Sequence, residues 1–219
     1  MYAEIFRIKE GKIKMPDFSV EDGCRGVVCG IDEAGRGPWV GNVVAGAVVI
    51  IDRNLCPELL QNLNDSKKLS KTKREKLYAL LREAEKLGQV AIGVGEATPA
   101  EIDRYNILQA TFMAMRRAVA NVSQRPDFAI IDGNRAPKDF AMPTKTVVKG
   151  DAKSYSISAA SIVAKVYRDR EMEQLAQKYP YYGFEHNAGY GTKDHIEGLK
   201  KYGIIPEHRK SYKPIKEFL

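Results

Sequence analysis

Short apolar runs rich in valine and isoleucine, separated by longer segments of helical periodicity, constrain this chain to the α/β class. The runs predicted to be strands are residues 26–31, 43–51, 90–94, 128–131 and 146–148. The segments predicted to be helices are residues 71–87, 98–122, 156–179 and 192–202, the second of them in two pieces. Three strands come first and the later strands alternate with helices, an order that predicts a mixed sheet flanked by helices.

One helix start is marked clearly by the sequence. Thr98 is a residue type that caps helices, Pro99 suits the first helical position, and Glu101 can complete a reciprocal capping box. We therefore expect the second long helix to begin at this point.

The chain is expected to form one core with an appendage. No stretch rich in proline, glycine or serine separates its elements. The part that carries the strands spans residues 25–180 and follows an N-terminal extension, residues 1–24. Residues 181–219 have a mostly helical pattern and are interpreted as a C-terminal helical appendage on that core.

Charge and cysteine usage limit the class of protein. Lysine and arginine number 35 against 28 aspartate and glutamate residues, a net charge of +7 that moderately favours an anionic partner. The three cysteines lack the number and spacing of a disulfide framework or a zinc site. The longest apolar run, residues 43–51, is too short to cross a bilayer, and the N-terminus has no signal-peptide core. We expect a cytoplasmic protein that does not bind membranes.

Acidic side chains stand where the predicted strands end. Asp32 and Glu33 follow the first strand, Asp132 follows the fourth, and Asp151 follows the fifth. Neighbours on a strand point to opposite faces, so Asp32 and Glu33 can share a site only if the strand ends or bends there. Carboxylates that gather repel one another unless divalent cations lie between them. The four are candidate metal ligands, although any one of them alone is better explained as a turn cap or a solvated acid.

Motifs along the chain narrow these alternatives. The stretch GIDEAGRGP at 30–38 resembles the signature of the type II ribonuclease H family, in which an Asp-Glu pair precedes a Gly-Arg-Gly loop. Further segments match in order: DSKKLS at 65–70, YNI at 105–107, IDG at 131–133, KGDAKS at 149–154, AASIVAKV at 159–166 and GYGTK at 189–193. The resemblance covers roughly residues 27–212, nearly the whole chain.

This resemblance implies a ribonuclease H-like mixed sheet, with residues 25–180 as the catalytic domain. It implies that Asp32, Glu33, Asp132 and Asp151 hold two Mg²⁺ or Mn²⁺ ions. The family's members are endonucleases, usually monomeric, that hydrolyse the RNA strand of RNA–DNA hybrids. They also incise 5′ of ribonucleotides embedded in duplex DNA and leave 5′-phosphate and 3′-hydroxyl ends. Ribonucleotide removal and primer removal are the implied roles.

The resemblance also implies which residues read the substrate. Gly35, Arg36 and Gly37 form the loop that recognises the junction between RNA and DNA. Glycine suits this task because backbone atoms can approach a 2′-hydroxyl only where no side chain intervenes. The junction-sensing tyrosine should be Tyr190, whose ring would pack on the sugar of the following deoxynucleotide. Without the resemblance, an aromatic residue that covers the appendage is the simpler interpretation.

Other positions carry weaker signals. Ser66, Lys67 and Lys149 are candidates for phosphate contacts, a role that any surface lysine fits equally well. Asp169 is an alternative fourth metal ligand, but the arginines on both sides of it favour an ion-pair role within a helix. The chain departs from the family at Asn42, where the family usually carries proline.

Three other functions compete with this interpretation. Gly35, Gly37 and Gly41 follow a strand as in a nucleotide-binding module, but their spacing departs from the dinucleotide fingerprint and Pro38 interrupts it. A non-catalytic nucleic-acid-binding protein with the same fold would not require metal. A DNA nuclease of the same fold, such as a resolvase, would not depend on a 2′-hydroxyl in its substrate.

Overall fold

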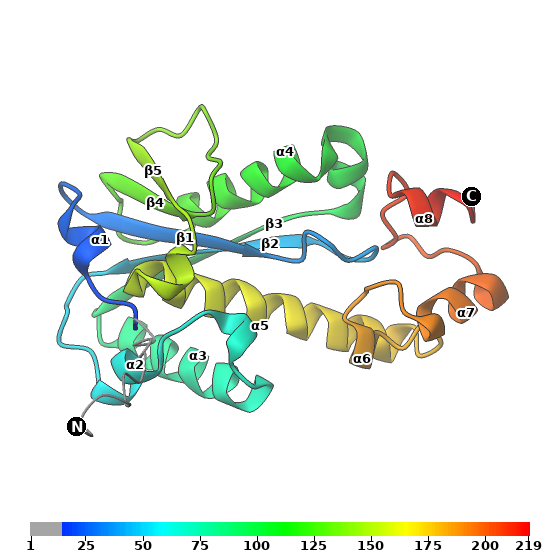
Figure 1. Cartoon of the computed structure of the whole chain (residues 1–219), viewed down its shortest axis with the longest axis horizontal. Helices are drawn as coiled ribbons and strands as arrows, with labels where there is room; N and C mark the ends of the chain where they lie inside the picture. The colour runs from blue at the N-terminus through cyan, green and yellow to red at the C-terminus, as the bar shows by residue number, and fades with distance from the viewer. Residues whose placement is uncertain (1–14) are drawn as a thin grey trace, which may run out of the picture.

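The computed structural model describes residues 15–219 as a five-stranded sheet with helices on both faces (Figure 1). Residues 1–14 of the predicted N-terminal extension lie outside the described residues. The strands are β1 (Val28–Ala34), β2 (Val43–Ile50), β3 (Val90–Ala97), β4 (Phe128–Asp132) and β5 (Thr144–Val147). All five predicted strands are present, and β1 continues three residues beyond its predicted end at Ile31.

The strand order β3-β2-β1-β4-β5 makes the sheet mixed, as predicted. The pairs β1–β2 and β2–β3 are antiparallel, whereas the pairs β1–β4 and β4–β5 are parallel. The carboxyl ends of β1, β4 and β5 therefore lie side by side at one end of the sheet. This is the position in which sites of α/β proteins form.

One long helix dominates each face of the sheet (Figure 1). α4 (Pro99–Ala120) packs on β2 and β3, and α5 (Tyr155–Lys178) packs on β1 and β2 from the other side, with α3 (Lys71–Lys86) beside it. β2 contributes Val49 to the core under α4 and Val48 to the core under α5. Burial of alternate residues on opposite faces explains why this strand reads as a continuous apolar run.

The start of α4 confirms the predicted cap. Thr98 Oγ1 accepts a hydrogen bond from Glu101 N at 3.3 Å, and the Glu101 carboxylate accepts one from Thr98 N at 2.9 Å. The predicted division of this helix is also present, because Asn106 has a φ of 69° and interrupts it. Asn106 Oδ1 accepts hydrogen bonds from Leu108 N and Gln109 N, and so caps the second piece.

Glycines let α5 approach the sheet closely. A Cβ on Gly46 of β2 would lie 2.4 Å from Ala160 O, and a Cβ on Gly30 of β1 would lie 2.3 Å from the carbonyl carbon of Ser156. Both neighbours are backbone atoms of α5, which cannot move aside as a flexible side chain can. The absence of a side chain at these positions thus sets the distance between the helix and the strands that lead to the candidate site.

Gly30→Ala is expected to lower the free energy of unfolding by about 3 kcal/mol, the upper range for overpacking of a core. The added methyl group would overlap the first turn of α5. Gly23→Ala is the matched control, because Gly23 has a φ of −76° and its nearest neighbour would lie 3.4 Å away. Urea unfolding measures both variants, and equal stabilities would contradict this account of the packing.

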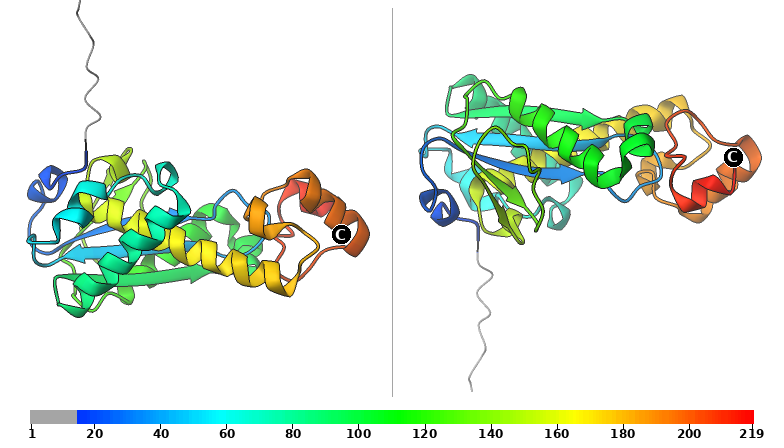
Figure 2. Two further views of the ribbon diagram at one scale, coloured as in Figure 1. Left: turned by 90° about the horizontal axis from the view of Figure 1, so that it is seen from below. Right: turned by 90° about the horizontal axis from the view of Figure 1, so that it is seen from above.

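Beyond the sheet, α5 extends into the C-terminal appendage (Figure 2). The appendage contains α6 (Phe184–Asn187), α7 (Lys193–Tyr202) and α8 (Lys213–Lys216). Of these the sequence predicted only α7. A small separate core joins them, in which Leu199 of α7 and Met172 of α5 are buried together with Val40 from the loop after β1. That loop is therefore packed against the appendage.

Several short elements complete the described chain. They are α1 (Ser19–Asp22), α2 (Pro57–Asn62) and the 3₁₀ turns η1 (Ser66–Lys68) and η2 (Gly150–Ala152). No described helix is long and apolar enough to span a membrane. Cys24, Cys29 and Cys56 are free thiols, as their number and spacing predict.

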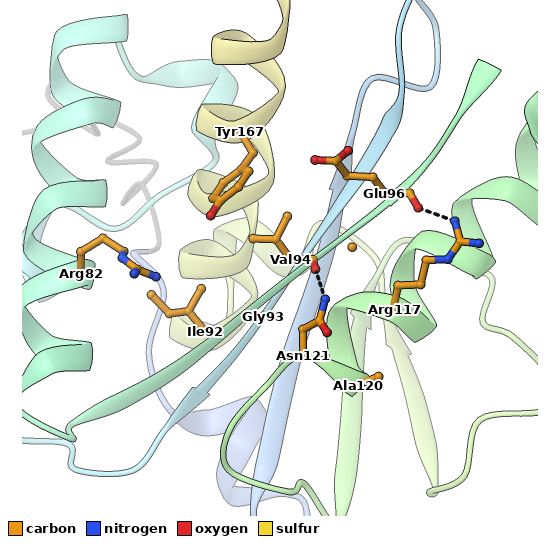
Figure 3. A pocket seen from close by; sticks show the side chains of 10 residues that line it. Arg82, Ile92, Gly93, Val94, Glu96, Arg117, Ala120, Asn121 and Tyr167 are labelled. Atoms are coloured by element: carbon orange, nitrogen blue, oxygen red, sulfur yellow. Dashed lines mark hydrogen bonds between the residues drawn. The ribbon is translucent and has the colours of Figure 1, made fainter.

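At the free edge of the sheet, two backbone carbonyls of β3 accept hydrogen bonds from side chains (Figure 3). Asn121 Nδ2 donates to Val94 O at 2.8 Å, and Arg117 Nη1 donates to Glu96 O at 2.7 Å. Unpaired backbone groups at a sheet edge otherwise favour pairing with another chain. These hydrogen bonds protect part of the β3 edge. The pocket beside β3 lies at this edge, two strands away from the carboxylates at the end of β1.

Candidate active site

Parallel pairing brings the predicted acids together at the end of the sheet. Ile31 of β1 lies beside Ile131 of β4, so the residues that follow them, Asp32 and Asp132, are neighbours across the two strands. Asp151 comes from η2, the turn after β5. One ligand oxygen from each of the three aspartates lies within 4.8 Å of the other two.

Backbone amides orient two of these carboxylates. Asp32 Oδ1 accepts a hydrogen bond from Glu33 N at 2.7 Å, and Asp132 Oδ1 accepts one from Gly150 N at 2.7 Å. Lys149 adopts the left-handed conformation, with a φ of 57°, at the turn that presents the Gly150 amide. The local backbone therefore holds the carboxylates in place without a ligand.

The three carboxylates repel one another in a buried setting. Burial, followed by the charges of Glu33 and Asp132, raises the pKa of Asp32 well above its ordinary value. Burial, followed by the charges of Asp132 and Asp65, raises the pKa of Asp151 to about 6. Asp32 and Asp151 are only 6% and 8% exposed. A divalent cation would neutralise this group, and an all-oxygen ligand set fits a hard cation such as Mg²⁺ or Mn²⁺.

Glu33 lies outside the group of three aspartates. β1 continues to Ala34, so the prediction that the strand ends at Ile31 is wrong. Glu33 nevertheless lines the same pocket as Asp32, and its charge contributes to the raised pKa of Asp32. Glu33 is not in the group of three, and its Oε1 accepts a hydrogen bond from Arg36 Nη1 at 3.1 Å. Burial raises the pKa of Glu33, and Arg36 partly offsets this rise. Glu33 thus stands between the aspartates and the glycine loop.

A pocket joins Asp32 and Glu33 to the glycine loop, whereas Asp132 and Asp151 do not line it. The predicted site residues that line it are Asp32, Glu33, Gly35, Arg36, Gly37, Ser66, Lys67 and Tyr190. A Cβ on Gly37 would lie 3.2 Å from Tyr190 Cε1, so the loop and the tyrosine ring are in contact. Tyr190 is 52% exposed. Lys149 is exposed as well, but it does not line this pocket.

Asp169, the alternative fourth ligand, also lines the pocket. It forms ion pairs with Arg74, at 3.1 Å, and with Lys165. It lies outside the group of three aspartates. This placement agrees with the ion-pair interpretation of Asp169.

Comparisons with known proteins place this arrangement in one family. The family model described as Ribonuclease HII matches residues 29–215. Ribonuclease HII of Shewanella piezotolerans is 54% identical over 194 residues, which cover 89% of this chain and 92% of that protein. Ribonuclease HII of Rhodospirillum rubrum is 53% identical over 206 residues, or 94% and 92% of the two chains. This chain belongs to the ribonuclease HII family.

A solved structure agrees with this membership. The crystal structure of ribonuclease H2 from Pyrococcus horikoshii is 31% identical and superposes with a TM-score of 0.70, covering 88% of this chain and 97% of that one. Ribonuclease HII enzymes are metal-dependent hydrolases that cleave RNA in RNA–DNA hybrids. The expected ribonuclease H-like fold is therefore confirmed, and the nucleotide-binding and non-catalytic alternatives are wrong.

Two residues of this ribonuclease HII site escaped the sequence analysis. Ser161, on α5, lies beside Asp32 and partly offsets the rise in its pKa, and its Oγ lies 2.7 Å from Ser66 Oγ. Asp65, at the start of η1, lies near Asp151, and its charge contributes to the raised pKa of that carboxyl. Both belong to motifs that carry the family resemblance. The motifs do not indicate that Ser161 lies beside Asp32 or Asp65 beside Asp151, however, because these contacts join distant parts of the chain.

Proposed function

We propose that Asp32, Asp132 and Asp151, together with Glu33, hold two divalent cations, Mg²⁺ or Mn²⁺. The observation that carries this proposal is the group of three aspartates, whose ligand oxygens lie within 4.8 Å of one another. When bound, the cations would activate an attacking water and offset charge on the leaving 3′-oxygen. The protein's part is to gather and orient the carboxylates, which the amides of Glu33 and Gly150 accomplish.

We also propose that cleavage occurs on the 5′ side of a ribonucleotide, in hybrids and in duplex DNA with an embedded ribonucleotide. The products would carry 5′-phosphate and 3′-hydroxyl ends. In support, the amide N–H groups of Arg36 and Gly37 have no acceptor among residues 15–219, and both residues line the pocket. Such amides can donate to a 2′-hydroxyl, the group that distinguishes RNA from DNA. Tyr190, in contact with Gly37, would pack on the adjacent sugar.

Phosphate contacts are proposed for Ser66, Lys67 and Lys149. Ser66 and Lys67 line the pocket, although Ser66 is 3% exposed and its hydroxyl faces Ser161. Lys149 is exposed two residues before Asp151. Lys67 and Lys149 would each place a positive charge near the substrate backbone.

The proposal also assigns different functions to two parts of the chain. Residues 25–180 would form the catalytic domain, and residues 181–219 an appendage that contributes to substrate binding. The contact between Tyr190 of the appendage and Gly37 supports this division. We propose a monomeric, cytoplasmic enzyme that takes part in ribonucleotide removal and primer removal.

Three end-labelled duplexes test the substrate class. One is all DNA, one carries a single ribonucleotide, and one carries a stretch of RNA. With Mg²⁺ or Mn²⁺ we expect incision of the last two only, at the phosphate 5′ to a ribonucleotide, and no incision in EDTA. Equal cutting of all three would instead indicate a DNA nuclease on the same fold.

Metal binding is expected to weaken as the pH falls through about 6. The pKa of Asp151 is about 6 in the folded chain, so protons compete with the cation below that value. In the absence of metal, the stability that Asp151 contributes to the fold changes with pH in the opposite direction to that of a salt-bridged acid. A carboxyl with a raised folded pKa favours the fold at low pH, and it loses that contribution as the pH rises from about 4 to about 6.

Thermal unfolding with Mn²⁺ and with EDTA, between pH 5 and pH 8, measures this linkage. We expect the rise in Tm that Mn²⁺ produces to grow steadily across that range. Asp151→Asn should weaken the dependence, since its amide does not titrate, whereas Asp32 keeps a raised pKa. A Mn²⁺ effect of equal size at pH 5 and pH 8 would contradict the prediction.

A further inference from the structure

Arg209 is fully buried between the appendage and the loop that follows β1. Its guanidinium donates hydrogen bonds to five carbonyl oxygens of that loop, at distances of 2.5–3.0 Å. The carbonyls belong to Gly35, Arg36, Pro38, Gly41 and Asn42. A guanidinium has five N–H groups in a rigid planar arrangement. The loop therefore wraps around one side chain that donates to five of its carbonyls.

The surroundings of Arg209 contain no ion-pair partner in the described part of the chain. Burial lowers the pKa of Arg209 to about 10, so the side chain stays cationic at neutral pH. Carbonyl dipoles and the Tyr212 hydroxyl, at 3.1 Å, solvate this charge in place of water. Loss of the guanidinium would leave several buried carbonyls without donors, which is costly.

Two more side chains hold the same loop. Tyr212 OH donates to Arg36 O at 2.6 Å, and Arg168 of α5 donates to Val40 O. The carbonyl of Arg36 is thus turned inward, toward Arg209 and Tyr212. The N–H groups of Arg36 and Gly37, two residues that line the pocket, have no acceptor among the described residues. The inward contacts consequently determine which backbone groups the loop presents to a substrate.

His208, the residue before Arg209, is connected to the backbone of Tyr190 through His195. His208 Nδ1 accepts from Ile205 N at 2.9 Å, which assigns its proton to Nε2. That Nε2 lies 3.0 Å from His195 Nε2, and His195 Nδ1 then donates to Tyr190 O at 3.0 Å. Two consecutive residues, His208 and Arg209, therefore anchor the backbone of the glycine loop and the backbone of Tyr190 to one segment of the appendage.

We propose that Arg209 is a positioning residue for ribonucleotide recognition. It holds the loop Gly35–Gly37 at a fixed place beside Tyr190, with the amides of Arg36 and Gly37 directed to the pocket. Arg209 itself does not touch the substrate, because its side chain is enclosed. The inference rests on the proposed function of this loop, and it extends recognition to a residue of the appendage that lies outside the pocket lining.

Arg209→Lys tests the proposal in steady-state cleavage of the single-ribonucleotide duplex. Lysine keeps the positive charge but has three donors on one atom, so it cannot match five carbonyls at once. We expect KM to rise about tenfold while kcat changes less than about threefold, the pattern of lost binding with intact chemistry. Incision at neighbouring phosphates should also become detectable. A purely structural defect would reduce the amount of active enzyme, and so lower kcat, without changing KM.

Two further variants keep the test decisive. Lys210→Gln removes the adjacent exposed charge and should leave KM unchanged. Tyr212→Phe removes one hydroxyl that contacts Arg36 O and should raise KM about threefold, the effect of one neutral hydrogen bond. If Arg209→Lys does not fold by circular dichroism, Tyr212→Phe decides alone. A KM within twofold of wild type in the folded variants overturns the inference. A wild-type enzyme that leaves the duplex uncut overturns the proposed function, and the inference with it.

Discussion

Asp32→Asn is expected to lower the rate of RNA cleavage by about 10³-fold or more, since removal of a central ligand disrupts the metal arrangement on which such chemistry depends. The same substitution is expected to raise the Tm of the chain in EDTA. Burial and neighbouring charges raise the pKa of Asp32, so its ionised form destabilises the metal-free fold at neutral pH. A neutral amide of the same shape removes that repulsion. Each kcal/mol gained would raise the Tm by roughly 2–4 °C.

Opposite changes in activity and stability are the distinctive outcome of this experiment. A variant that merely unfolds would lose both activity and stability, whereas a variant that lacks only a metal ligand would lose activity alone. Asp22→Asn is the control, because Asp22 is an exposed acid in a surface ion pair with Arg53, and it should change neither quantity. Near wild-type hydrolysis by Asp32→Asn at saturating Mg²⁺ would show that the assignment of Asp32 is wrong.

Tyr190→Ala is expected to lower kcat/KM on the single-ribonucleotide duplex by about 30-fold, within the 1–3 kcal/mol that aromatic stacking contributes to nucleic-acid binding. The ring lies against Gly37 and is half exposed in the pocket, where the sugar beside the ribonucleotide would lie. Little stability should be lost, because an exposed ring buries little apolar surface. Steady-state cleavage of the duplex, with the Tm of each variant, measures both effects.

The appendage offers a matched control for this tyrosine. Tyr181 is 58% exposed and stacks on Tyr202, outside the pocket lining. Tyr181→Ala should leave kcat/KM unchanged, and Tyr190→Phe should retain most of the activity because the ring remains. Equal losses in Tyr181→Ala and Tyr190→Ala would show that Tyr190 has no specific role at the junction.

Local patterns predicted the main elements of the fold well. The apolar runs of β2 and β3 and the cap at Thr98 depend on neighbouring residues alone, so the sequence indicates them directly. The division of this helix into two pieces was also predicted, and the structure places the break at Asn106. The end of β1 was placed too early, because glycines after Ala34 suggested a bend, whereas pairing with β2 extends the strand through Ala34.

Contacts between distant segments were beyond such patterns. Ser161 supports Asp32 from α5, across 129 positions of chain, and Arg209 holds a loop more than 160 positions away. Neither residue carries a local signal of its role, since serine and arginine side chains are mostly exposed in folded proteins. The short helices α6 and α8 were missed because four residues are too few to show helical periodicity.

The most direct test of the proposed metal site is calorimetric titration of Mn²⁺ into the wild-type chain, Asp132→Asn and Asp169→Asn at pH 8. Asp132 belongs to the group of three aspartates, whereas Asp169 lies outside that group, in the pocket that Asp32 lines, and forms ion pairs with Arg74 and Lys165. We expect saturable binding by the wild type and by Asp169→Asn, and a loss of at least about tenfold in affinity for Asp132→Asn. Equal affinity in all three proteins, or loss only in Asp169→Asn, would contradict the site proposed here.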